Sequence, residues 1–82
     1  MRNMKNSDLI NIESMCCKIM QLSNVIKGYS LTWHNGRIKV VLKDNYGIGI
    51  RYVSGSYANV RASIACILHG LEEVYMRESF SN

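Results

Sequence analysis

Residues 29–53 read YSLTWH-NG-RIKVVLK-DNY-GIGIRYV, and this stretch decides the fold. Asn35-Gly36 stands between two alternating runs. This is the strongest short-range signal for a β-hairpin, because both central residues of a type I′ turn need positive φ. Asp44-Asn45-Tyr46 marks a second short turn before the third run. The stretch therefore predicts a three-stranded antiparallel meander.

The Asn-Gly turn also predicts which residues face one another. A two-residue turn pairs His34 with Arg37, and the pairing runs outward from there. Side chains alternate between the two faces of a strand. One face therefore collects the apolar residues of the first two strands, which are Tyr29, Leu31, Trp33, Ile38, Val40 and Leu42. A one-residue slip would scatter this set, so the pattern supports the register.

The register of the third run depends on the length of the second turn. If the loop is Asp44-Asn45-Tyr46, Lys43 pairs with Gly47. This register adds Ile48, Ile50 and Tyr52 to the apolar face. We expect that face to be packed, with Trp33 and Tyr52 in the core, because large aromatics contribute mainly to packing.

The opposite face carries charge. In the expected register its rows are Ser30–Val41–Gly49, Thr32–Lys39–Arg51 and His34–Arg37–Val53, with Lys43 at the edge. Lys39 directly opposite Arg51 is unfavourable, because like charges on facing strand positions repel. Two interpretations stay open. The long side chains splay apart in solvent, or the pair binds an anion, with phosphate the first choice.

Helices are predicted on both sides of the meander. The first covers residues 7–27, with Ser7 or Asn6 as its cap, Asp8 in the first turn and Lys27-Gly28 as the stop. Its apolar stripe comprises Leu9, Ile12, Cys16, Ile19, Leu22 and Ile26. The second covers residues 57–78 behind the cap Ser56, and Gly70 marks either a close helix approach or an early end. We expect an α+β domain of order α-β-β-β-α with both helices on one face of the sheet.

Composition bounds the class of protein. Eighty-two residues fit one domain, residues 1–82, whose ends we expect to fray at 1–6 and 79–82. The net charge of +4 is unevenly spread, since from Lys27 to Arg61 six basic residues stand against one acid. A basic centre favours an acidic partner, nucleic acid first. Three Cys without a signal peptide or membrane-spanning run predict free thiols and a cytoplasmic location.

The order and lengths of these elements resemble the double-stranded RNA-binding domain family. The likeness covers residues 7–75 and is one of topology more than of sequence, with a Gly-x-Gly strand passing through a Ser-capped loop into an Ala-rich helix. In that family a Lys-Lys-x-Ala-Lys cluster opens the last helix and grips phosphates. Residues 57–61 here read YANVR, and Arg61 alone keeps the charge. The family's long first hairpin loop, with a His that reaches the minor groove, is reduced to residues 34–37. The resemblance implies an RNA-binding fold whose charge has moved onto the open sheet face.

Patterns for catalysis and metal binding are missing from the sequence. There is no Cys-x-x-Cys and no His pair at ligand spacing, which argues against zinc. Cys66 and His69 lie three apart, but nothing nearby suggests the orienting group and oxyanion site that a nucleophile–base dyad needs. Gly47-x-Gly49 lies in a strand and lacks the third Gly of a phosphate-binding loop. We expect a protein that is not an enzyme and has no cofactor or metal.

Two functions remain. The first is a small nucleic-acid-binding module, favouring RNA, that contacts phosphates through a basic surface. We expect little base recognition, because exposed aromatics are missing from the expected open face. The candidate binding residues are Lys39, Arg51, Arg37, Lys43, Arg61, Lys27 and His34.

The second function is a protein-binding inhibitor, of the viral counter-defence or antitoxin type, that blocks a host or toxin enzyme, alone or together with RNA. Small chains without catalytic patterns are frequent among such proteins. The basic face would dock on an acidic protein surface, or an edge strand would extend a partner's sheet. The expected edge strands, residues 29–34 and 47–53, also allow a homodimer.

Overall fold

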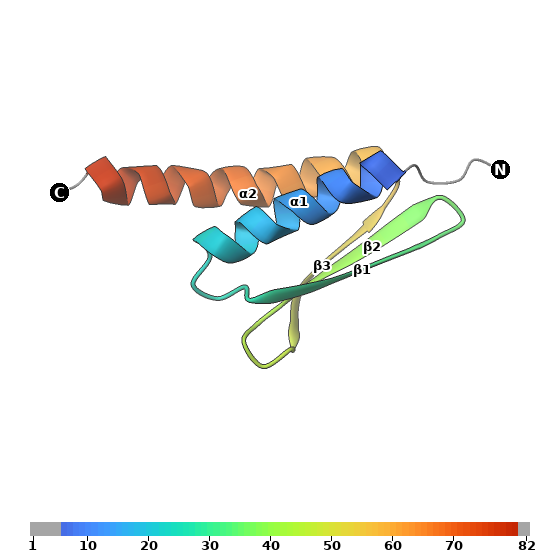
Figure 1. Ribbon diagram of the computed structural model, residues 1–82, viewed down its shortest axis with the longest axis horizontal. Helices are drawn as coiled ribbons and strands as arrows, with labels where there is room; N and C mark the ends of the chain where they lie inside the picture. The colour runs from blue at the N-terminus through green and yellow to red at the C-terminus, as the bar shows by residue number, and fades with distance from the viewer. Residues whose placement is uncertain (1–5, 81–82) are drawn as a thin grey trace.

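The computed structural model describes the backbone of residues 6–80 and the side chains of residues 6–77. The elements are α1 (Asn6–Leu22), β1 (Gly28–His34), β2 (Arg37–Lys43), β3 (Gly49–Gly55) and α2 (Tyr57–Phe80). The strands form one antiparallel sheet in the order β1-β2-β3. Both helices lie side by side on one face of this sheet, and the other face is open (Figure 1). The predicted α+β class and the order α-β-β-β-α are confirmed. Most of the expected fraying falls on residues 1–5 and 81–82, which lie outside the described residues.

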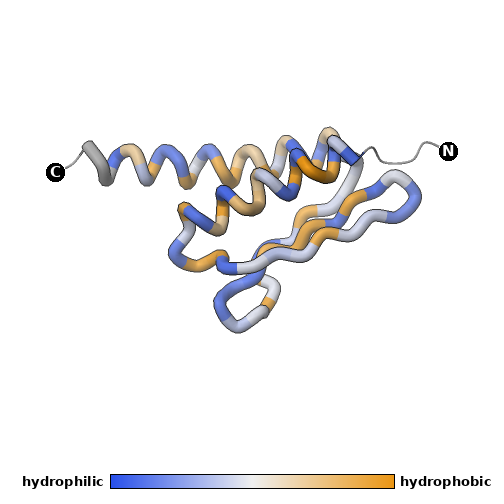
Figure 2. The backbone as a smooth tube through the Cα atoms, viewed as in Figure 1, coloured by the Kyte–Doolittle hydropathy of each residue, from blue (hydrophilic) through white to orange (hydrophobic). Residues whose placement is uncertain are grey.

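The covered face of the sheet and the helices above it form an aliphatic core. Its fully packed members are Ile12, Cys16 and Ile19 of α1, Ile38, Val40 and Leu42 of β2, Val53 of β3, and Val60, Ile64 and Leu68 of α2. Apolar and polar residues alternate along the strands and recur at each turn of the helices (Figure 2). Each such side chain contributes about 1.5–3 kcal/mol when it leaves water. This one-sided core leaves the second face of the sheet to solvent.

α1 ends at Leu22, five residues before the predicted stop. Ser23 explains the early end, because its Oγ accepts hydrogen bonds from the backbone N–H groups of Val25 (3.1 Å) and Ile26 (2.9 Å). Such local bonds compete with the helical pattern. Lys27 Nζ then donates to the Ser23 carbonyl at 2.9 Å and caps the end of the helix.

α2 passes through Gly70 without a break and continues to Phe80. Gly70 is exposed, and a Cβ added there would meet nothing within 4 Å. It therefore marks neither a close helix approach nor an early end, and both predicted alternatives are wrong. The last turns of α2 extend past the end of α1 and past the sheet (Figure 1).

The first hairpin has the predicted register. Seven pairs run from Gly28 opposite Lys43 to His34 opposite Arg37. The turn residues Asn35 and Gly36 have φ values of 51° and 76°, as a type I′ turn requires. The faces of β1 and β2 are therefore as predicted.

The second hairpin has a different register from the predicted one. Lys39 faces Ser54, not Arg51, so β3 is displaced by three residues. Two of the three come from a longer loop, in which Asp44 Oδ1 accepts hydrogen bonds from the backbone N–H groups of Tyr46 (2.9 Å) and Ile48 (3.0 Å). The third comes from a β-bulge. Leu42 pairs with Arg51 and Lys43 pairs with Gly49, which leaves Ile50 without a partner in β2.

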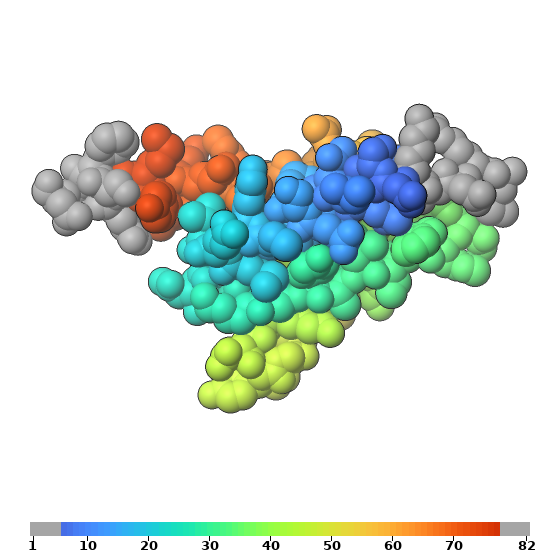
Figure 3. All heavy atoms as spheres, in the orientation of Figure 1, coloured from blue at the N-terminus to red at the C-terminus, as the bar shows by residue number. Residues whose placement is uncertain are grey.

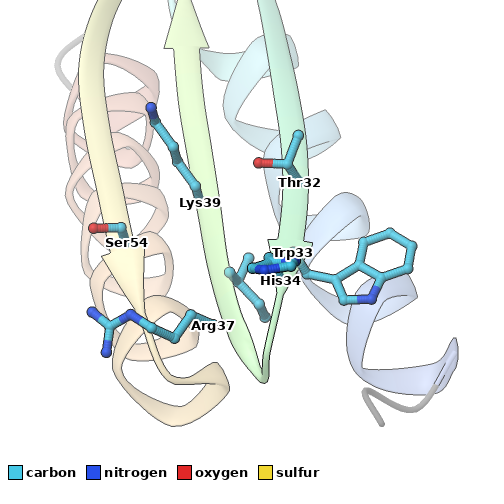
Figure 4. A pocket seen from close by; sticks show the side chains of 7 residues that line it. Thr32, Trp33, His34, Arg37, Lys39 and Ser54 are labelled. Atoms are coloured by element: carbon cyan, nitrogen blue, oxygen red, sulfur yellow. The ribbon is translucent and has the colours of Figure 1, made fainter.

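This displacement exchanges the faces of β3. Val53 is buried in the core opposite Val40, whereas Tyr52 lies on the open face opposite Val41 and is 64% exposed. Ile48 and Ile50 are exposed as well, so the predicted burial of Ile48, Ile50 and Tyr52 is wrong. Trp33 keeps its predicted face but is 54% exposed, because its ring extends past the edge strand β1 (Figure 4).

Candidate nucleic-acid interface

Three cations stand on the open face of the central strand. Arg37, Lys39 and Lys43 occupy three of the four open-face positions of β2, and Val41 occupies the fourth. Alternate residues of a strand lie about 6.6–6.8 Å apart, a spacing comparable to that of phosphates along an extended nucleic-acid strand. We call Arg37, Lys39 and Lys43 the basic ridge.

No acid balances the basic ridge within the described strands. The residues that share the open face from β1 and β3 are Gly28, Ser30, Thr32, His34, Gly49, Tyr52 and Ser54. The nearest acid along the chain is Asp44, whose Oδ1 already accepts two backbone hydrogen bonds in the second loop. The ridge therefore presents uncompensated positive charge, which attracts anions.

The other predicted binding residues are more scattered. His34 joins the ridge, because it lies on the open face opposite Arg37. Arg51 stands opposite Leu42 on the covered side, where it is exposed at the margin of the sheet. Lys27 uses its amine to cap α1, and Arg61 is exposed on α2. The structure thus brings Arg37, Lys39, Lys43 and His34 together on one face and places Arg51, Arg61 and Lys27 elsewhere.

The expected repulsion between Lys39 and Arg51 does not occur. The two residues lie on opposite faces of the sheet, since Lys39 pairs with Ser54 and Arg51 pairs with Leu42. The prediction of a facing like-charge pair is wrong because it depended on the three-residue loop. Lys39 instead places its Nζ 5.9 Å from the centroid of the Tyr52 ring, within the range of a cation–π contact.

Tyr52 is the open-face residue that the sequence analysis missed. Its hydroxyl end lies over Gly49 and next to Val41, because a Cβ built on Gly49 would be 2.6 Å from Tyr52 Oη and 2.8 Å from Val41 Cγ1. The expectation that this face lacks exposed aromatics is wrong. The sequence does contain a sign of the different register. Asp44 is followed three residues later by Gly47, a pattern typical of a loop that is closed by side-chain hydrogen bonds and is longer than the expected three residues.

A shallow depression of about 340 Å³ lies at the first-hairpin end of the ridge. Its lining consists of Thr32, Trp33, His34, Arg37, Ile38, Lys39 and Ser54. Figure 4 shows Thr32, Lys39 and Ser54 on three neighbouring strands, with the Trp33 ring turned outward beyond β1. Cationic and hydroxyl groups meet here, which suits a phosphate-bearing ligand.

The titratable groups with shifted pKa values lie on the covered side. Burial raises the pKa of Cys16 from 9.0 to about 11. Burial and a hydrogen bond donated to Glu13 (3.1 Å) raise the pKa of Tyr29 to about 12. Both groups are therefore protonated at neutral pH, and neither belongs to the open face. Within residues 6–77, no group of three His, Cys, Asp or Glu side chains is placed to hold a metal ion.

No protein family, no curated protein and no solved structure matches the chain. The topology agrees with the resemblance to the double-stranded RNA-binding domain, and the comparisons assign no family. Neither described helix has the length and apolar character needed to span a membrane.

Proposed function

We propose that this protein is a small nucleic-acid-binding module, favouring RNA, that holds phosphates on the basic ridge. The supporting observation is the alignment of Arg37, Lys39 and Lys43 on one strand of an open face whose described positions carry no acid. Phosphate contacts of this kind supply most of the sequence-independent affinity of nucleic-acid-binding proteins. Thr32, Ser54 and His34 around the ridge add hydrogen-bonding groups for phosphate and sugar.

The grip on duplex RNA that the family resemblance implies has little support. Val60, in the opening turn of α2, is fully buried in the core. Arg61 lies in the helix layer, on the other side of the sheet from the ridge. The two-residue turn at Asn35-Gly36 also reaches far less than a long loop. The open face of the sheet is therefore the surface that we assign to the nucleic acid.

Fluorescence anisotropy of the full chain with labelled RNA tests this function. We expect the affinity to fall steeply between about 50 mM and about 200 mM salt. The variant Arg37→Thr/Lys39→Thr/Lys43→Thr should bind more weakly at every salt concentration. Its slope of log affinity against log salt should be smaller by about 2, because three phosphate contacts are lost. Threonine suits exposed strand positions, so the fold should persist.

A matched control uses cations of the helix layer. Lys18→Thr/Arg61→Thr removes two charges from exposed positions of α1 and α2 and should leave the affinity within about twofold of the original. Equal losses of affinity per removed charge in both variants would mean that net charge alone attracts the RNA. The absence of binding at about 50 mM salt would overturn the proposal, because sequence-independent binding is strongest at low salt.

A protein-binding inhibitor is the second candidate, and one observation favours it. The loop of the second hairpin projects from the body (Figure 3). This loop and the start of β3 expose Tyr46, Ile48 and Ile50, with Tyr46 84% exposed. Exposed apolar groups that gather in one place are typical of docking surfaces. The RNA titration separates the candidates, because a chain that binds no RNA at low salt leaves protein binding as the better explanation of this surface.

A further inference from the structure

The Tyr52 ring occupies an unusual position for a large aromatic side chain. It lies on the open face of a sheet, 64% exposed, with its hydroxyl end over the backbone of Gly49. The absence of a side chain at Gly49 makes room for the ring, since an added Cβ would also come within 3.0 Å of Tyr52 Cζ. Tyr52 is thus supported from below by Gly49 and Val41, and most of the residue remains exposed.

One cation of the basic ridge, Lys39, reaches over this ring. Lys39 Nζ is 5.9 Å from the ring centroid. Val41 lies next to Gly49 and separates Lys39 from Lys43 along β2. The ring therefore lies next to a gap between two cations of the ridge. A base that stacks on Tyr52 would take the place of Lys39 Nζ over the ring. The long side chains of Lys39 and Lys43 would then reach the phosphates on either side of that base.

We propose that the nucleic acid is single-stranded, with an unpaired base stacked on Tyr52 and the adjacent phosphates on the basic ridge. This inference rests on the proposed function and adds the class of ligand. A base within a duplex is stacked on both sides, so its faces are closed to a ring on a flat sheet. A single strand can turn its bases outward onto an aromatic side chain, and such stacking tolerates any sequence.

Three labelled probes separate stacking from phosphate binding. They are a short unstructured RNA strand, the same strand annealed to its complement, and an abasic strand with the same number of phosphates. We expect the unstructured strand to bind most tightly. Tyr52→Leu should weaken its binding about 10- to 100-fold, the range typical of losing one stacked base. Tyr52→Phe should stay within about threefold, because the ring is kept.

Gly49→Ala tests the position of the ring without removing it. The backbone at Gly49 lies outside the left-handed region, so alanine adds no backbone strain. Its Cβ would lie 2.6 Å from Tyr52 Oη and 2.8 Å from Val41 Cγ1, so both side chains must move. We expect weaker binding of the unstructured strand and little change for the abasic one. Gly28→Ala is the matched control, because a Cβ at this open-face position makes only ordinary contact with Lys43 Cβ at 3.7 Å. Tyr75→Leu removes an equally exposed tyrosine from α2 and should have no effect.

The outcomes distinguish this inference from the proposed function. Equal affinity for single strand and duplex, or unchanged binding by Tyr52→Leu, would overturn the stacking inference. If the triple ridge variant still loses affinity in that case, phosphate binding stands alone. If none of the three probes binds at low salt, the proposed function falls and the inference falls with it. Circular dichroism of Tyr52→Leu and Gly49→Ala should match that of the original chain, because both changes lie on the exposed face.

Discussion

The two faces of β2 differ sharply although they share one backbone. Val40 is completely buried between the sheet and the helices, whereas its neighbour Val41 is half-buried on the open face beside Tyr52. The covered face carries only aliphatic residues at the centre of the strand, and the open face carries the basic ridge. Alternate residues of this one strand therefore serve stability and charge separately. A change on one face should therefore leave the property of the other intact.

Replacing the two adjacent valines in turn gives the largest expected contrast. Val40→Ala removes two buried methyl groups and leaves a cavity, so we expect the free energy of unfolding to fall by about 2 kcal/mol. Val41→Ala should cost less than about 1 kcal/mol, because its side chain is only half-buried. Urea unfolding followed by Trp33 fluorescence measures both values. Equal losses would mean that the open face also supports the fold, and the division between the faces would fail.

The Asp44 side chain helps to determine which residues of β3 lie on each face of the sheet. A one-residue slip of β3 would exchange Tyr52 and Val53 between the faces, and the Asp44 side chain fixes the loop that prevents it. Asp44→Ala removes two hydrogen bonds to backbone N–H groups, so we expect a loss of about 1 kcal/mol in unfolding free energy. RNA binding should weaken in parallel, because Tyr52 loses its defined position.

Asn45→Ala is the control for this loop. Asn45 is exposed and neighbours Asp44, so its replacement should change unfolding free energy by less than about 0.5 kcal/mol. If Asp44→Ala is as mild as Asn45→Ala, the loop does not determine the register, and the bulge at Ile50 alone must do so.

Two adjacent cysteines of α1 differ in the same way as the two valines of β2. Cys16 faces the core, and Cys17 faces the solvent. Burial raises the pKa of Cys16 from 9.0 to about 11. The folded chain therefore holds this proton more tightly than the unfolded chain. The contribution to stability is complete below pH 9 and is lost as the pH rises toward 11. Alkylation of the folded chain near pH 8, read by mass spectrometry, should label Cys17 and Cys66 and spare Cys16. Rapid labelling of Cys16 would show that the covered side opens easily.

The first hairpin was predictable because its determinants are local. Asn35-Gly36 needs only its own two positive φ values to set the register. The alternation on either side then assigns every residue of β1 and β2 to a face. Arg37, Lys39 and Lys43 were therefore placed on the open face from the sequence alone. Their role in binding remains a prediction.

The second hairpin was not predictable in the same way. Its register depends on a side chain, Asp44, that bonds to backbone groups two and four residues ahead, and on a bulge at Ile50. Neither feature leaves a periodic pattern in the sequence. The three-residue loop predicts Arg51 on the open face and Tyr52 in the core. One member of the expected charge pair and the exposed tyrosine of the open face are therefore misplaced.

The two helices share one layer, and this determines how the protein can be oriented. α1 begins and α2 ends at opposite ends of a molecule 52 Å long, both on the side away from the open face (Figure 1). An attachment at the start of α1 or at the end of α2 would therefore hold the protein by its helix layer and leave the open face of the sheet exposed to solvent. Immobilisation through one end, or through both, presents the same surface to a passing ligand.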